Sequence, residues 1–190
     1  MSSIARWLEE AGHALAAVDP QAVNRAARAL VEVRARGGTI FTAGNGGSAS
    51  TASHLALDLQ KAGGTKALAL SDNVGLITAW ANDTTFDRVF AEQLRMLGGS
   101  GDAVVVISVS GSSPNLIALL KQARTMQLTT VGLLGRDGGE ARALVDVAVV
   151  VPSDDYGWVE TAHVALHHVL TYAIRDLASD AAPLRRIAGD

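Results

Sequence analysis

TIFTAGNGGSASTASHLALD, residues 39–58, reads as a short apolar strand, a glycine-rich turn and the start of a helix. Ile40 and Phe41 favour a strand, and the glycines after them permit backbone dihedrals that other residues avoid. Hydroxyl side chains follow where the helix begins, and the first amides of a helix point outward with the positive end of its dipole. The segment is therefore either a phosphate-binding turn or only a tight turn. No Lys follows the glycines and the pattern GxGxxG is absent, which disfavours binding of a nucleoside triphosphate or a dinucleotide.

A second loop of the same kind is ISVSGSSPN, residues 107–115. A strand leads into a glycine, and Pro114 opens the next helix. One serine would be an ordinary N-cap, whereas the hydroxyls of Ser108, Ser110, Ser112 and Ser113 exceed what capping needs. The two loops together indicate a binding site for a sugar phosphate or a similar anion.

The rest of the chain alternates between strands and helices. The strands are β-branched and apolar on both faces, as buried parallel strands are. This pattern predicts an α/β fold, a doubly wound parallel sheet flanked by helices, with ligands at the carboxyl ends of the strands. We expect leading helices at 4–18 and 20–36, strands at 67–70, 103–108, 129–134 and 147–151, and helices at 74–80, 86–96, 114–126, 140–144 and 158–177.

The composition is that of one globular domain. A chain of 190 residues, 48% of them hydrophobic, can bury one sizeable core. We expect a single domain over residues 1–190, with leading helices at 1–36, an α/β core at 37–180 and a tail at 181–190. The net charge is −3 with no basic block, so direct nucleic-acid binding is not expected, and the absence of Cys excludes disulfides and thiol chemistry.

The first residues, MSSIARWLEEAGHAL, carry Glu9 and Glu10 where a signal peptide would have an apolar centre. No apolar run in the sequence is long enough to span a bilayer. We therefore expect a cytoplasmic protein that does not bind a membrane.

A His and a carboxylate follow the first loop at helical spacing. His54 and Asp58 are four residues apart, so their side chains leave one face of a helix below the predicted phosphate. That arrangement suits two ligands of one metal ion, or a carboxylate that orients an imidazole. In isolation the same pair would be read as a solvated surface pair, and its position directly after the loop favours a functional role.

The last helix offers several partners for this pair. At about 100° per residue, Glu160 shares a face with His163 and His167, whereas His168 lies roughly 80° away. Periodicity thus favours His167 as the companion of Glu160.

The two loops, together with WANDTTFDRVFAEQL, GLLGRDGG and VPSDDYGWVETAHVALHHVL, resemble the sugar isomerase (SIS) domain family and within it the bacterial phosphoheptose isomerases. The matching stretches cover nearly the whole chain in the family's order. The resemblance implies a SIS fold, isomerisation of sedoheptulose 7-phosphate and a homotetramer. A branch of the same subfamily associates with a replication initiator and is not known for isomerase chemistry.

The resemblance also implies roles for individual residues. It assigns the phosphate to the serine loops and the sugar contacts to Asn45 and Asp83. His54, Asp58, Glu160 and His168 fall at four family positions that surround a zinc ion in some members, and it favours His168 over His167. The implied substrate-binding residues are Asn45, Gly46, Gly47, Ser48, Asp83, Ser108, Ser110, Ser113 and Glu160.

Aldose–ketose isomerisation needs a base that removes a proton beside a carbonyl and an acid that moves protons between the oxygens of the enediol. We expect Asp58 and His168 to exchange these protons, with His54 and Glu160 completing a Zn²⁺ site that stabilises the oxyanion. Three residues depart from the family pattern: Asp58 replaces Glu, Glu160 replaces Gln, and Val109 replaces Thr.

The leading hypothesis is therefore a phosphoheptose isomerase. The alternatives are a non-catalytic SIS protein that binds a sugar phosphate or a protein partner such as a replication initiator, and an isomerase of another phosphosugar. A pure binding module would have no need for His54, Asp58, Glu160 and His168 together, which favours the enzyme.

Overall fold

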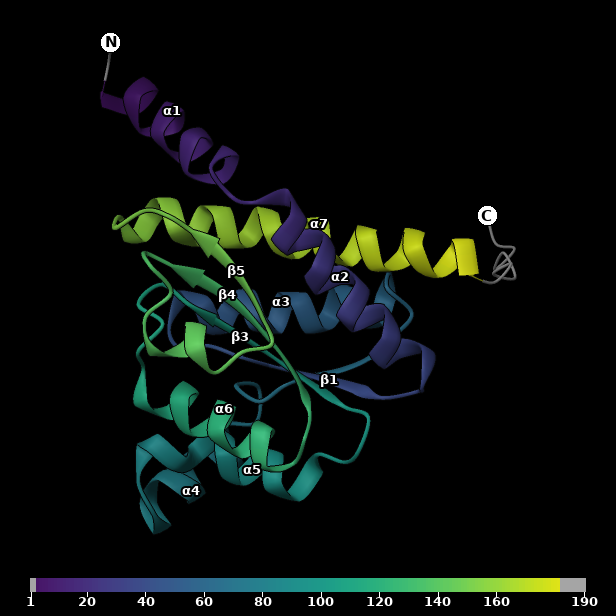
Figure 1. The fold of residues 1–190 in the computed structure, drawn as a ribbon. Coiled ribbons are helices and arrows are strands. Elements are labelled where there is room, and N and C mark those ends of the chain that lie inside the picture. The colour runs from purple at the N-terminus through teal and green to yellow at the C-terminus, as the bar shows by residue number, and fades with distance from the viewer. Residues whose placement is uncertain (1–2, 182–190) are drawn as a thin grey trace.

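The chain folds around one parallel sheet of five strands, seen in a computed structural model that describes residues 3–181 (Figure 1). The strands lie in the order β2-β1-β3-β4-β5, and every neighbouring pair is parallel. The strands are β1 (Thr39–Ala43), β2 (Lys66–Ala69), β3 (Ala103–Ser108), β4 (Thr129–Gly135) and β5 (Val147–Val151). The predicted doubly wound parallel sheet is confirmed.

Helices cover both faces of the sheet (Figure 1). The helices α2 (Pro20–Ala35), α3 (Gly47–Lys61) and α7 (Tyr156–Ala181) pack on one face, and α1 (Ser3–Ala16) lies against α7. The other face carries α4 (Val74–Asp83), α5 (Val89–Leu97) and α6 (Pro114–Thr125), with short 3-10 turns η1 (Phe86–Arg88) and η2 (Glu140–Ala143).

Alternating side chains of the strands build a core on each face. In β3 every residue is buried, so Val105 and Ile107 join the core under α2, α3 and α7, while Val104 and Val106 join the core under α5 and α6. Burial on both faces explains why the strand sequences are continuously apolar. The same alternation fixes the register, because a shift of one residue would exchange the two cores.

The strand order places a crevice between β1 and β3. The chain leaves β1 towards α3 on one face and leaves β3 towards α6 on the other. Loops that diverge in this way open a space at the carboxyl ends of the two strands, where ligands bind in open α/β sheets. The two glycine and serine loops of the sequence are the loops that flank this space.

Most predicted elements agree with the structure to within about two residues, and the differences have local causes. The segment expected as one helix at 86–96 divides into η1 and α5. The helix expected to start at residue 158 starts at Tyr156, because the Asp155 carboxylate accepts a hydrogen bond of 3.0 Å from the Trp158 amide. Asp19 caps α2 as predicted, accepting from the amides of Gln21 and Ala22.

The predicted tail at 181–190 lies, apart from Ala181, outside the described residues. Among the helices that the structure describes, none combines the length and the hydropathy needed to cross a membrane.

Candidate active site and metal cluster

The serine loops line a small cavity of about 150 Å³ at the crevice. Ser48 comes from the start of α3, and the other hydroxyls come from the loop between β3 and α6. No charged side chain lines the cavity, so an anion there would be held by hydroxyls and backbone amides. The lining residues are Asn45, Ser48, Ile107, Ser108, Val109, Ser110, Ser113, Leu116 and Tyr156.

The loop between β3 and α6 is held open by internal hydrogen bonds. The Ser108 hydroxyl accepts from the Gly111 amide at 3.0 Å, and the Ser110 hydroxyl accepts from the Ser112 amide at 3.3 Å. Gly111 has a φ of +63°, and a Cβ there would lie 2.0 Å from the Gly138 carbonyl oxygen, so only glycine fits. Ser113 occupies the N-cap position of α6 without making a side-chain capping bond, which leaves its hydroxyl available to a ligand.

The turn before α3 also leaves the start of its helix without a side-chain cap. Gly46, at the N-cap of α3, has a φ of +56° and offers no side-chain cap. The two turns are joined by a reciprocal amide pair, in which Asn45 donates to Asn115 at 2.9 Å and Asn115 donates to Asn45 at 2.8 Å. Both helix starts therefore face one cavity, as the sequence predicted, and their role in phosphate binding stays a prediction.

Further along α3, three imidazoles converge on one carboxylate. Oδ2 of Asp58 lies 3.5 Å from Nε2 of His54, 3.3 Å from Nε2 of His167 and 3.3 Å from Nδ1 of His168. One ligand atom from each of the four residues lies within 4.8 Å of the others. Of the predicted metal set, the structure thus brings together His54, Asp58 and His168, and it adds His167.

The cluster suits a transition metal. Burial, followed by the proximity of His168 and His54, lowers the pKa of His167 to about 4. A neutral imidazole is the form that binds a metal, and neither nitrogen of His167 makes a hydrogen bond within the described structure. Three imidazole nitrogens and a carboxylate oxygen are also a common type of donor set for zinc. The sequence missed His167 because the resemblance outweighed the periodicity that favoured it.

Glu160 is not part of this cluster. Its carboxylate lies over the first residue of α3, where a Cβ on Gly47 would come within 2.6 Å of Oε1 and 2.7 Å of Oε2. Gly47 therefore leaves room for Glu160 beside the serine cavity. The sequence correctly places Glu160 on the face of α7 that meets α3, but the expectation that it completes the cluster does not match this position.

Asp83 lies in a different part of the molecule. It ends α4, is exposed, and accepts a hydrogen bond of 2.9 Å from the Asn82 side chain. Asp83 does not line the serine cavity, and its predicted sugar contact stays a prediction.

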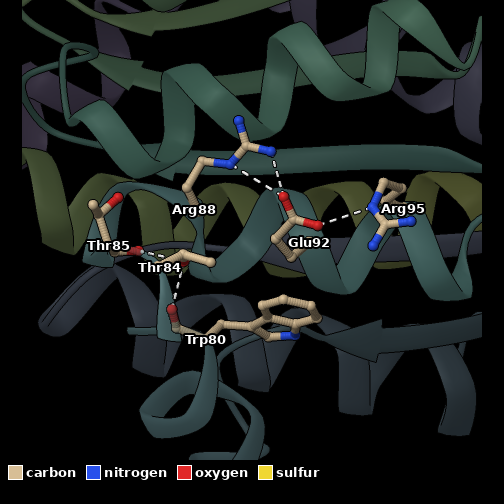
Figure 2. A network of polar contacts seen from close by, with 6 residues as sticks. All are labelled: Trp80, Thr84, Thr85, Arg88, Glu92 and Arg95. Atoms are coloured by element: carbon tan, nitrogen blue, oxygen red, sulfur yellow. Dashed lines mark hydrogen bonds and ion pairs between the residues drawn. The ribbon is translucent and has the colours of Figure 1, made fainter. Parts of the chain in front are cut away.

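The segment after Asp83 is held by a carboxylate between two guanidinium groups (Figure 2). Glu92, 7% exposed, accepts from Nε of Arg88 at 3.1 Å and from Nε of Arg95 at 2.8 Å. These two hydrogen bonds lower the pKa of Glu92. Thr84 closes α4 by donating to the Trp80 carbonyl. The ion pairs join η1 to α5, and the Thr84 hydrogen bond caps the end of α4.

Comparison with known proteins finds close relatives. Residues 6–135 match the family model described as SIS domain. The chain is 42% identical over 175 residues to a protein named phosphoheptose isomerase from Solidesulfovibrio magneticus, covering 88% of this chain and 85% of that one. It is 41% identical over 149 residues to a phosphoheptose isomerase from Trichlorobacter lovleyi, covering 76% of each chain.

Solved structures agree with these relatives. A phosphoheptose isomerase from Neisseria gonorrhoeae superimposes with a TM-score of 0.86 at 33% identity, covering 91% of this chain and 97% of that chain. A phosphoheptose isomerase from Francisella tularensis gives a TM-score of 0.87 at 30% identity, covering 93% of this chain and all of that one.

Proposed function

The chain belongs to the SIS domain family and, within it, to the phosphoheptose isomerases, and we propose that it interconverts sedoheptulose 7-phosphate and a D-glycero-heptopyranose 7-phosphate through an enediol. It is thus an aldose–ketose isomerase. The serine cavity takes the phosphate. No charged side chain lines this cavity, and the first amides of α3 and α6 have no side-chain cap, so they are available to an anion.

The observation that carries this proposal is the placement of two unlike sites along one helix. The serine cavity lies at the amino end of α3, and His54 follows Gly47 by seven residues, which is about 10 Å along the helix axis. An extended sugar phosphate held by its phosphate would direct its far end along α3. The reacting carbons then lie at the cluster, where proton-transferring groups are concentrated.

Asp58 and His168 exchange the protons of the reaction. Their contacts in the cluster use Asp58 Oδ2 and His168 Nδ1, so Asp58 Oδ1 and His168 Nε2 remain for the substrate. Both side chains are partly exposed, unlike the buried His167. A carboxylate takes the proton from the carbon beside the carbonyl, and an imidazole moves protons between the two oxygens.

His54, Asp58, His167 and His168 are the proposed ligands of a Zn²⁺ ion, with His167 in the place predicted for Glu160. When bound, the ion polarises the carbonyl and stabilises negative charge on the enediol oxygens. The contacts of the Asp58 carboxylate with the three imidazoles orient these side chains in the site.

The test is an NMR assay of the purified protein with sedoheptulose 7-phosphate, with added zinc and again after chelation. Formation of an aldose 7-phosphate only with zinc supports both the reaction and the metal, and formation in both conditions supports the reaction alone. An absence of turnover in both conditions would favour an isomerase of another phosphosugar or a non-catalytic protein that binds a sugar phosphate or a replication initiator.

We also propose that the protein acts as a cytoplasmic homotetramer. Ile4 and Leu8 on α1 are 72% and 64% exposed, although α1 is otherwise amphipathic and packs on α7. Apolar side chains of this size on one helix favour contact with another subunit. Light scattering after gel filtration measures the number of subunits directly.

A further inference from the structure

Arg136 places a positive charge beside one wall of the serine cavity. It directly follows β4, at the carboxyl end of a strand, where ligands bind in sheets of this kind. Its guanidinium carbon lies 5.5 Å from the ring centroid of Tyr156, within the range of a cation–π contact. Tyr156 itself lines the cavity, which has no charged side chain in its lining. Arg136 therefore contacts a side chain that borders any phosphate bound in the cavity.

The backbone holds Arg136 in a conformation that is unfavourable for this residue type. Arg136 has a φ of +55°, in the left-handed region that residues other than glycine rarely adopt. Its amide donates a hydrogen bond of 3.1 Å to the Ser153 carbonyl, in the connection between β5 and α7. In the same turn, the Gly138 carbonyl packs against Gly111 of the loop between β3 and α6. The turn is thus held between two segments that border the cavity. Glycine would fit residue 136 with less strain, so an arginine there points to a function of its side chain.

The charged group of Arg136 is not committed to a structural partner. Its Nε lies 3.9 Å from Oδ1 of Asp154, beyond the range of a hydrogen bond, and the Asp154 side chain is 96% exposed. An ion pair with so exposed a partner contributes little to stability. By contrast, Arg88 and Arg95 are both hydrogen-bonded to the buried Glu92. The Arg136 side chain is 41% exposed, so its guanidinium can adjust towards an anion without leaving a buried site.

We propose that Arg136 is a positioning residue that attracts the phosphate of the substrate into the serine cavity and balances its charge there. The hydroxyls and helix-start amides of the cavity supply only hydrogen bonds and partial charges, whereas a phosphate monoester carries about −1.5 to −2 at pH 7. A full positive charge beside the cavity raises the local concentration of the anion and favours its bound state. This inference rests on the proposed function, because it takes the serine cavity as the phosphate site.

The experiment is a titration of the purified protein with inorganic phosphate, followed by ³¹P NMR, for wild type and Arg136→Gln. Loss of the charge should raise the dissociation constant by about 5- to 15-fold at low ionic strength. Arg136→Lys keeps the charge and should restore most of the affinity.

The matched control is Arg175→Gln, which removes a similar cation from another part of α7. The Arg175 guanidinium carbon lies 4.7 Å from the ring centroid of Tyr172, and its Nε lies 2.8 Å from Asp176. Arg175 is 19 residues beyond Tyr156, which is about 28 Å of helix. Arg175→Gln should therefore bind phosphate as wild type does.

The salt dependence separates an effect of charge from an effect of structure. The screening length is about 30 Å at 0.01 M salt and about 3 Å at 1 M salt. The difference between wild type and Arg136→Gln should therefore shrink to less than about 2-fold at the higher concentration. A distortion of the turn would instead weaken binding to the same extent at both concentrations. With sedoheptulose 7-phosphate as substrate, Arg136→Gln should raise KM and leave kcat nearly unchanged, because the cluster is untouched.

Phosphate binding is measured without turnover, so its outcome is separate from that of the proposed function. If Arg136→Gln weakens binding as expected but wild type forms no aldose, the isomerase proposal is wrong and the role of Arg136 stands. If wild type isomerises and Arg136→Gln binds phosphate as wild type does, the role of Arg136 is wrong and the isomerase stands. A loss that is independent of salt, or that Arg136→Lys shares, also overturns the role.

The location of the bound ion is tested with Ser110→Ala, which removes a hydroxyl from the lining of the cavity. This variant should weaken phosphate binding as well. Binding that Ser110→Ala leaves unchanged would place the ion outside the serine cavity, and it would overturn the role of Arg136. An absence of phosphate binding by wild type would overturn it too.

Discussion

Acid should destabilise the protein through a buried imidazole on α7 that has no role in the proposed reaction. His163 is fully buried, and neither of its ring nitrogens makes a hydrogen bond in the described structure. Burial lowers the pKa of His163 from 6.5 to about 4, and the nearby Leu134 carbonyl offsets only part of this effect. His163 is therefore neutral in the folded protein at pH 5, whereas it is charged in the unfolded chain.

The sign and the size of the effect follow from this difference. Between pH 6.5 and about 4 the unfolded chain binds more protons than the folded protein, so the free energy of unfolding rises with pH across this window. The contribution of neutral His163 to the free energy of unfolding is complete above pH 6.5 and is lost as the pH falls towards 4. A difference of 6.5 against about 4, at about 1.4 kcal/mol per pH unit, gives a loss of roughly 3 kcal/mol from this one residue.

The assay is urea unfolding of metal-free protein at several pH values from 7 to 4, for wild type and His163→Leu. The variant replaces the imidazole by an apolar side chain of similar size, so its free energy of unfolding should fall by about 3 kcal/mol less than that of wild type over this range. His13→Gln, at an exposed site on α1, is the matched control and should follow wild type. Parallel pH profiles for wild type and His163→Leu would refute the reasoning.

Four further predictions concern the site and its support. Ser110→Ala should raise KM about 10- to 100-fold with little change in kcat, because it removes a hydroxyl from the phosphate cavity without touching the cluster; steady-state kinetics measure this. Gly111→Ala should weaken phosphate binding in a ³¹P NMR titration, since its Cβ would lie 2.0 Å from the Gly138 carbonyl oxygen. Glu92→Gln should lower the free energy of unfolding by about 1–3 kcal/mol at pH 7, and this difference should shrink as the pH falls below 4.5, because hydrogen bonds from Arg88 and Arg95 lower the pKa of Glu92. Leu8→Glu should give a smaller assembly in light scattering, whereas Glu9→Gln should leave it unchanged.

The fold could be predicted because its signals are local and redundant. A sheet whose strands are apolar on both faces must be packed against helices on both sides. The segments between the predicted strands are long enough to form these helices. The carboxyl-end rule then places the loops after β1 and β3 together, and Asn45 and Asn115 do pair across them. Element boundaries differ from the predicted ones where a single side chain sets them, as Asp155 does at the start of α7.

The cluster of His54, Asp58, His167 and His168 could be predicted only in part, because a helical projection gives the angle of a residue around the axis but not its position along the axis. Glu160 and His167 do share the face of α7 that meets α3, as periodicity predicts. They are nonetheless about 10 Å apart along the axis, and ligands of one zinc ion each lie within about 2.3 Å of it. Only the alignment of α3 with α7, a tertiary property, determines that Asp58 lies level with His167 and His168 while Gly47 lies level with Glu160.

Asp58 and Glu160 both depart from the family pattern, and both departures are explained once His167 is counted in the cluster. A shorter carboxylate at residue 58 is surrounded by three imidazoles, so the cluster has a full set of four donors without Glu160. Glu160 is thereby free to lie against the first residue of α3, where Gly47 makes room for it. A carboxylate at that place is unfavourable for phosphate binding, since like charges repel. Its negative charge instead faces the positive end of the α3 dipole, which favours a carboxylate at the start of a helix.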